Sequence, residues 1–180
     1  MIQVDRREVA APLGRVFACA AAVERWPEWL AHYRWVRFVK RTPDGSGGGE
    51  GEAGGGDGGG LVEMAAWRRF GPLRWPVRWV SEMRVDREAP AVRYRHVRGI
   101  TRGMDVEWAF APDGGRVVVT ITHRWSGPPW PLVGGVVAAG IIGPVFVHAI
   151  AQRTLAGVAR VAERGETGEG AERGAQPGAR

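Results

Sequence analysis

The chain of 180 residues has only one cysteine, Cys19, and only one lysine, Lys40. A lone cysteine excludes an intramolecular disulfide and a zinc site made of several thiolates. Because lysine is so scarce, arginine carries almost all of the positive charge behind the net value of +6. The arginines are dispersed and form no basic run interleaved with aromatic residues, so the sequence gives no support to nucleic-acid binding.

The first ten residues, MIQVDRREVA, lack the uninterrupted apolar run of a secretory signal peptide. We therefore expect a cytoplasmic protein. A chain of this length is typical of one domain with a substantial core.

The sequence contains an apolar run long enough to raise the question of a membrane span, the twenty residues Leu132–Ala151. The run continues as an amphipathic helix pattern, which a helix surrounded by lipid would not show. Pro144 suits the first turn of that helix. Helical spacing then gives one apolar face, made of Val147, Ala151, Thr154, Leu155, Val158 and Ala162. We therefore expect the segment Leu132–Glu163 to cover an apolar surface of the same chain.

Two segments are too rich in glycine and polar residues to predict regular structure. Residues 42–60 are expected to form a flexible loop, and residues 164–180 a disordered tail. Glycines in the loop match a G-x-G-x-x-G spacing, but no strand-to-helix turn follows them, so no nucleotide site is expected. The domain is therefore predicted to span residues 1–163.

The remaining chain changes its hydrophobic period several times. Residues 2–9 alternate like a strand, and residues 11–30 have the spacing of two short helices. From Tyr33 to Trp125 the alternation is that of an antiparallel sheet with one buried face. It predicts the following inward residues: Trp75, Val77, Trp79, Ser81, Met83 and Val85; Val92, Tyr94 and His96; Met104, Val106, Trp108 and Phe110; Val117, Val119, Ile121, His123 and Trp125. We therefore predict an α+β fold of about six or seven antiparallel strands covered by the C-terminal segment.

Several motifs are shared with a known group of proteins. Ala11–Pro12 stand before the first helix and Trp26–Pro27–Glu28 between the two helices, and the stretches HVRGITRGMDVEWAFAP and GPVFVHAIAQRTLAGV follow later. Together they resemble the START-like (SRPBCC) superfamily, in particular its polyketide cyclase/dehydrase and coenzyme-Q-binding branch. The resemblance implies a helix-grip fold, in which a curved sheet wraps around a long C-terminal helix and leaves an apolar pocket between them.

The resemblance also implies pocket positions. Aromatase/cyclases of this superfamily often carry Trp-x-Ser-x-Arg on one pocket strand and a further arginine on the next. Trp79 and Ser81 match that motif, whereas Met83 stands in place of its arginine. His96 stands about where the second arginine is expected, and Tyr33 matches a pocket tyrosine. The positive charge that would stabilise an oxyanion is therefore absent from both positions.

Three histidines are candidate site residues. His96 and His123 project from predicted strands toward the pocket, and His148 lies at the edge of the inward face of the closing helix. Such an imidazole could act as an acid or base near neutral pH, or form pocket wall bonded to a neighbouring hydroxyl or carbonyl. No H-x-H or H-x-x-x-H spacing occurs, so we expect no metal site, and no cofactor is indicated.

The aromatic and hydroxyl side chains of the inward face are further candidates. Trp79, Tyr94 and Trp108 could stack on a ligand, with core filling as the alternative. Met83 faces the same way. The lone hydroxyl of Ser81 in an apolar row requires a partner, which would be a ligand oxygen, a pocket water or a backbone carbonyl.

These features favour a protein that binds a hydrophobic small molecule, such as a lipid, an isoprenoid quinone or a polyketide-like compound, in an apolar cavity. The alternative is an enzyme, an aromatase-type cyclase or dehydratase acting on a poly-β-keto chain. In it His96 would be the acid/base, while Tyr33 and Ser81 would orient oxygens. A third hypothesis is an adaptor that binds a protein or an anionic surface through outward arginines, namely Arg78, Arg84, Arg93 and Arg95. Transient contact with a membrane surface and the oligomeric state stay open.

Overall fold

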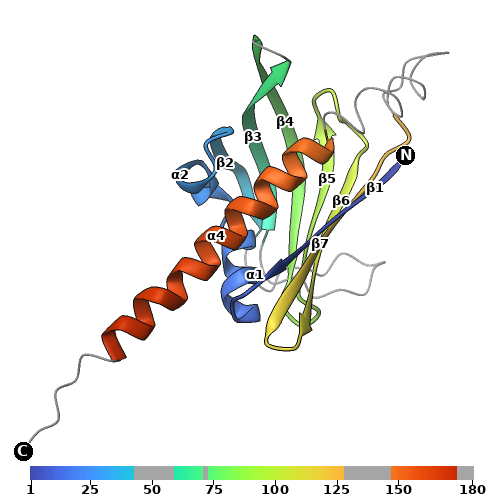
Figure 1. Cartoon of the computed structure of the whole chain (residues 1–180). Helices are drawn as coiled ribbons and strands as arrows, with labels where there is room; N and C mark the ends of the chain where they lie inside the picture. Colours follow the sequence, from blue (N-terminus) through green and yellow to red (C-terminus); the bar gives the residue numbers. More distant parts are fainter. Residues whose placement is uncertain (43–58, 71–72, 128–146, 174–180) are drawn as a thin grey trace, which may run out of the picture.

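The computed structural model describes residues 1–42, 59–70, 73–127 and 147–173. In these residues a seven-stranded antiparallel sheet faces a long C-terminal helix (Figure 1). The strands are β1 (Ile2–Val9), β2 (Tyr33–Thr42), β3 (Gly59–Phe70), β4 (Leu73–Asp86), β5 (Ala91–Arg98), β6 (Asp105–Asp113) and β7 (Arg116–Arg124). The helices are α1 (Leu13–Ala21), the 3-10 turn η1 (Val23–Arg25), α2 (Trp26–Trp29) and α4 (His148–Arg173).

This arrangement confirms the predicted α+β helix-grip fold, including the short helices after the first strand. The order of strands in the sheet is β1-β7-β6-β5-β4-β3-β2. Neighbouring strands from β2 to β7 pair in sequence order, and β1 pairs with β7. The turn between β6 and β7 contains Gly114 and Gly115 at φ 53° and 86°. Two positive φ values in a row match the tightest hairpin turns and are easy only for glycine.

The alternation seen in the sequence sorts the side chains between the two faces of the sheet. On β6 and β7 the inward residues are buried, while the residues between them are partly or fully exposed. On β4, Trp79, Ser81, Met83 and Val85 are buried as predicted, but Trp75 is 65% exposed. Trp75 lies near the start of β4, where the pattern of alternation continues beyond the core. The core therefore lies on the side of the sheet that faces α4.

Helix α4 runs diagonally across the inward face of the sheet, and its last turns extend past α1 (Figure 1). The apolar face predicted for it is buried throughout its described length, from Val147 to Ala162. Arg153 and Arg160 on the same helix are exposed. A Cβ atom at Gly157 would lie 1.9 Å from Cδ2 of Leu30. The lack of a side chain there lets the helix lie directly on the connection between α2 and β2.

Helix α4 continues to Arg173, whereas the composition predicts a disordered tail from residue 164. Extending a helix that is already packed adds one hydrogen bond per residue, so it needs no strong local signal. Residues 43–58, within the expected glycine loop, and residues 132–146, within the apolar run, lie outside the described residues. Among the described helices, none is long and apolar enough to cross a membrane.

Candidate functional site

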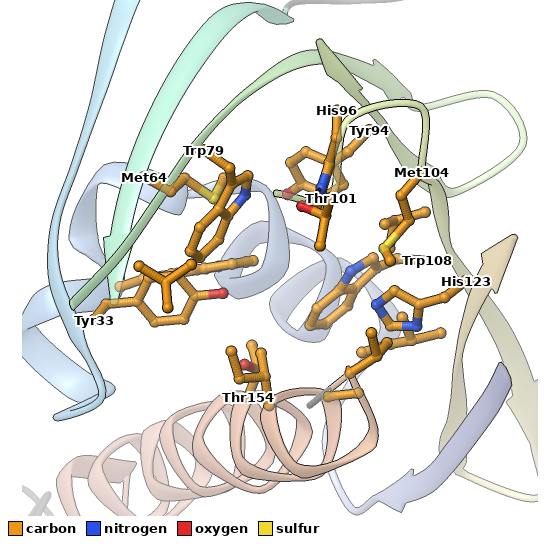
Figure 2. Close-up of a pocket in the computed structure, with 17 residues that line it drawn as sticks. Tyr33, Met64, Trp79, Tyr94, His96, Thr101, Met104, Trp108, His123 and Thr154 are labelled. Carbon is orange, nitrogen blue, oxygen red and sulfur yellow. Dashed lines mark hydrogen bonds between the residues drawn. The ribbon is translucent and has the colours of Figure 1, made fainter. Parts of the chain in front are cut away.

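A cavity of about 80 Å³ lies between α4 and the inward face of the sheet (Figure 2). Every strand from β2 to β7 contributes to its wall, as do α2 and α4. The side chains that line it are mostly aromatic or aliphatic: Trp26, Tyr33, Met64, Val77, Trp79, Tyr94, His96, Thr101, Met104, Val106, Trp108, Ile121, His123, Val147, Ile150, Ala151 and Thr154. The described part of the wall contains no arginine, lysine, aspartate or glutamate.

The few polar groups of the cavity lie on opposite sides of it (Figure 2). On the sheet side, Nδ1 of His96 lies 2.7 Å from Oγ1 of Thr101. On the helix side, Oγ1 of Thr154 lies 3.1 Å from Nε2 of His32, which stands outside the cavity. The hydroxyl of Tyr33 points into the space between these pairs. A ligand there would meet apolar walls with a small number of fixed hydrogen-bonding groups.

The His96 imidazole is held in its neutral form. Burial and the neighbouring His123 lower the pKa of His96 from 6.5 to about 3. The ring also stacks against Trp79, with 6.1 Å between the ring centroids and 26° between the planes. A neutral imidazole can donate one hydrogen bond and accept another, but a pKa near 3 makes it a weak base at neutral pH.

The hydroxyl of Tyr94 is buried and has no hydrogen-bond partner among the described residues. Burial, with a smaller contribution from Tyr33, raises the pKa of Tyr94 well above 10. The group is therefore a protonated donor at every physiological pH. A buried donor without an acceptor costs free energy, and a ligand oxygen in the cavity could accept a hydrogen bond from it.

Six of the nine side chains predicted for the site line the cavity. They are Tyr33, Trp79, Tyr94, His96, Trp108 and His123. Met83 and Ser81 face inward and are buried, but neither is among the residues that line the cavity. The Ser81 hydroxyl has no partner among the described residues. The structure therefore brings Tyr33 and His96 to one cavity and does not bring Ser81 to it.

His148 is placed elsewhere. Its side chain is half exposed, and Nδ1 lies 2.5 Å from Oδ1 of Asp5 on β1. Helix geometry explains this position, since residues 147, 150, 151 and 154 already form the cavity stripe and residue 148 is turned away from it. His148 is therefore not among the described residues that line the cavity.

Two functional candidates were missed by sequence reasoning. Thr101 lies in the connection between β5 and β6, where no periodic pattern indicates which way a side chain points. Thr154 was assigned to the inward face of the helix, yet a single polar residue in an apolar stripe was a usable signal for the site. Among the described residues, no three histidine, cysteine, aspartate or glutamate side chains are grouped so that they could hold a metal ion.

Solved structures with this fold come from several organisms. A protein called TTHA0849 from Thermus thermophilus matches with a TM-score of 0.66 and 18% identity, over 89% of this chain and 95% of that one. The Zhui aromatase/cyclase from Streptomyces sp. R1128 matches with a TM-score of 0.65 and 18% identity, over 91% of this chain and 94% of that one. A START superfamily protein from Mycobacterium smegmatis has a TM-score of 0.59 and 13% identity, over 90% and 94%. At these identities the likeness shows a shared fold.

No curated protein matches the chain significantly in sequence. The model of one protein family, described as polyketide cyclase/dehydrase and lipid transport, does match it over residues 1–163. That match covers all described strands and the part of α4 that packs on the sheet. Together with the helix-grip fold, it shows that the chain belongs to the START-like polyketide cyclase/dehydrase and lipid-transport family.

Proposed function

We propose that the protein binds a hydrophobic small molecule, such as a lipid, an isoprenoid quinone or a polyketide-like compound, in the cavity beneath α4. The observation that carries the proposal is the cavity wall, which is apolar apart from a few hydroxyls and imidazoles and includes Tyr94, whose buried hydroxyl has no partner among the described residues. Family membership supports it, since the family description includes lipid transport.

The chemistry of the wall specifies the kind of ligand end that fits. Tyr94 supplies a buried hydrogen-bond donor, and the Tyr33 hydroxyl points into the same space (Figure 2). A carbonyl or quinone oxygen could accept from either. Trp79 and Trp108 offer flat apolar surfaces beside these donors. An oxygen acceptor on the part of an apolar ligand that lies beside these donors would therefore add to the affinity.

The cavity is smaller than the roughly 300–1,000 Å³ usual for pockets that hold drug-sized ligands. Two methionines in its wall, Met64 and Met104, have flexible side chains that adapt to the shape of a guest. We expect ligand entry to widen the cavity by repacking such side chains rather than by moving the strands.

Binding can be measured with the neutral fluorophore Nile red and with native mass spectrometry of the purified protein. Ala151→Leu puts a longer side chain into the cavity and should abolish binding. Ala149→Leu makes the same change on the exposed side of α4 and should leave binding unchanged. A wild-type protein that binds neither Nile red nor any apolar compound from a lipid extract would refute the proposal.

The second candidate function is an aromatase-type cyclase or dehydratase acting on a poly-β-keto chain. The observation that favours it is that Tyr33 and His96 line one cavity. The low pKa of His96 counts against an acid/base role at neutral pH, because proton transfer works best when the pKa lies near the operating pH. Incubation with a poly-β-keto thioester, comparing wild type with His96→Gln, separates the two functions. Product formation that depends on His96 would establish catalysis.

A further inference from the structure

A second hollow lies beside the cavity, between α4, the α2–β2 connection and β3. Its volume is about 390 Å³. Two indoles and two guanidinium groups dominate its lining, from Trp29, Trp67, Arg153 and Arg160. The hollow plays no part in the function proposed above, and its chemistry differs from that of the cavity, whose described lining contains no arginine.

The two arginines stand two turns apart on the same side of α4, with Ala156 and Gly157 between them. Neither residue extends a side chain beyond Cβ into the space between the guanidinium groups. The place in front of Gly157 is filled by Leu30, since a Cβ atom at Gly157 would lie 1.9 Å from Cδ2 of Leu30. The long arginine side chains can converge on a group held between them in the hollow.

No acidic side chain among the described residues forms an ion pair with Arg153 or Arg160. The cations nearby are engaged with the indoles, since Arg34 lies over the ring of Trp67 at 4.6 Å and Arg25 over that of Trp29 at 5.4 Å. Most arginines on the outer face of the sheet have carboxylate partners by contrast, as Arg93 does. Arg25 also pairs with Glu28 at 3.1 Å, and that carboxylate accepts a hydrogen bond from Nε1 of Trp29 at 3.2 Å. Arg153 and Arg160 are thus the charges in the lining of the hollow that have no carboxylate partner among the described residues.

The hollow and the cavity meet at one hydrogen-bonded pair. Thr154 lines the cavity and His32 lines the hollow, with 3.1 Å between Oγ1 and Nε2. A molecule longer than the cavity could extend past this pair, so that its two ends would meet different surroundings. An anionic end inside the cavity would be buried without a charged partner, which is strongly unfavourable. In the hollow it would meet two guanidinium groups.

We propose that the hollow binds the anionic head group, a carboxylate or a phosphate, of an amphipathic ligand whose apolar part occupies the cavity. This inference rests on the proposed binding function and adds the class of ligand: a long-chain acid rather than a fully neutral molecule. Guanidinium groups match both carboxylate and phosphate oxygens with paired hydrogen bonds.

The test compares three ligands of equal chain length, a fatty acid, a lysophosphatidic acid and the corresponding fatty alcohol, by isothermal titration calorimetry. We expect the wild type to bind at least one of the acids about tenfold more tightly than the alcohol at low salt. The acid that binds more tightly shows whether the hollow prefers a carboxylate or a phosphate head group. Arg153→Gln/Arg160→Gln should reduce the affinity for that acid to the level of the alcohol. Arg7→Gln/Arg98→Gln removes the same charge from exposed positions elsewhere and should change neither affinity.

Each other outcome is informative. Equal wild-type affinity for the acids and the alcohol would overturn the head-group site and leave the proposed binding function intact. A double variant that loses acid and alcohol affinity alike, or keeps both, would also overturn it. Failure of the wild type to bind any of the three would remove both proposals together. Thermal unfolding of both double variants verifies that folding is unchanged.

Discussion

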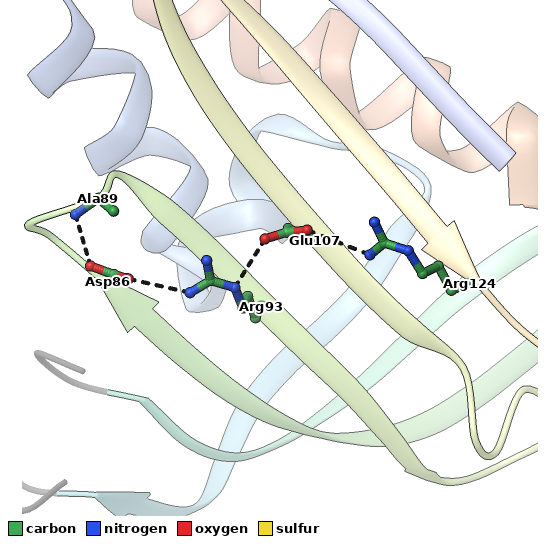
Figure 3. A network of polar contacts seen from close by, with 5 residues as sticks. All are labelled: Asp86, Ala89, Arg93, Glu107 and Arg124. Atoms are coloured by element: carbon green, nitrogen blue, oxygen red, sulfur yellow. Dashed lines mark hydrogen bonds and ion pairs between the residues drawn. The ribbon is translucent and has the colours of Figure 1, made fainter. Parts of the chain in front are cut away.

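The two faces of the sheet treat polar groups in opposite ways, and adjacent residues on β5 show the contrast. Outward, Arg93 donates to Glu107 at 3.0 Å and to Asp86 at 3.3 Å, while Arg124 approaches the other oxygen of Glu107 at 3.5 Å (Figure 3). Inward, Tyr94 has a buried hydroxyl without a partner among the described residues. On the outer face these charged groups are paired with one another, whereas on the inner face buried hydroxyls such as that of Tyr94 have no partner among the described residues.

The same contrast bears on the adaptor hypothesis. Arg78 pairs with the buried carboxylate of Glu63, which also accepts two hydrogen bonds from Arg37. Burial alone would raise the pKa of Glu63, but the two arginines outweigh it and lower that pKa. Since Arg95 approaches Asp105 at 3.4 Å as well, these outward arginines are already used within the sheet. The outer face is thus better suited to hold the strands in register than to capture an anionic partner.

The largest difference in stability should appear when one side chain on each face of the sheet is truncated to alanine. Trp108→Ala is expected to lower the free energy of unfolding by about 3–5 kcal/mol, because it removes a buried aromatic ring and enlarges the cavity. Arg95→Ala should cost less than about 1 kcal/mol, since its ion pair is exposed. Urea denaturation measures both. Similar losses in the two variants would contradict the contrast.

The second prediction concerns His96 and acid. Its pKa of about 3 in the fold lies below the value of about 6.5 in the unfolded chain. Between pH 3 and pH 6.5, His96 therefore binds a proton in the unfolded chain but not in the folded protein. The free energy of unfolding is highest above pH 6.5 and falls as the pH is lowered toward 3. At pH 5 the expected loss is about 2 kcal/mol relative to pH 7.

The contribution of His96 is isolated by comparison with His96→Gln, which has no titrating ring. Urea denaturation at a series of pH values measures the free energy of unfolding of both proteins. The variant should lose less of this free energy on acidification than the wild type does. In the wild type, the NMR shifts of the His96 ring should stay constant from pH 7 to about pH 4. A ring that titrates near pH 6.5 would show that it is charged in the fold.

The third prediction uses two buried hydroxyls. Tyr94→Phe and Ser81→Ala each remove a hydroxyl that has no partner among the described residues, so each is expected to leave stability unchanged or raise it by about 1 kcal/mol. Of the two, Tyr94 lines the cavity and Ser81 does not. Tyr94→Phe should therefore weaken the binding of a carbonyl-bearing ligand relative to Nile red, whereas Ser81→Ala should not. Equal effects of both on binding would contradict the assignment of Tyr94 as a ligand donor.

The sequence predicted which face most strand residues occupy, because alternation depends only on the local period of two. That was sufficient to place Trp79 and His123 on the inward side. Alternation could not show that Trp79 lines the cavity while Met83, on the same strand and face, does not. Nor could it show that Trp75 lies beyond the core. The position of the cavity along β4 depends on where α4 crosses the sheet, which is a property of the whole fold.

The sequence could not predict the positions of His148 and Thr101, for different reasons. A helix turns by about 100° per residue, so a residue at the margin of a stripe can face the cavity or the neighbouring strand. In this fold a buried carboxylate on β1, Asp5, gives His148 its partner. Thr101 lies in a connection between two strands, where the sequence has no hydrophobic periodicity. Only its contact with His96 identifies it as a site residue. The second hollow was invisible because α2, β3 and α4 are far apart in the sequence.

The smallest expected effect lies in the outer network. Arg93→Ala removes both of its ion pairs, yet the guanidinium is about half exposed, so the loss of stability should not exceed about 1 kcal/mol at low salt. Raising the salt concentration should shrink the difference from the wild type, because exposed charges are screened. Nile red binding should be unaffected, since the change is on the face away from the cavity. A large, salt-independent loss would mean that the outer charges support the core packing around Tyr94, and the separation between the two faces would then be incomplete.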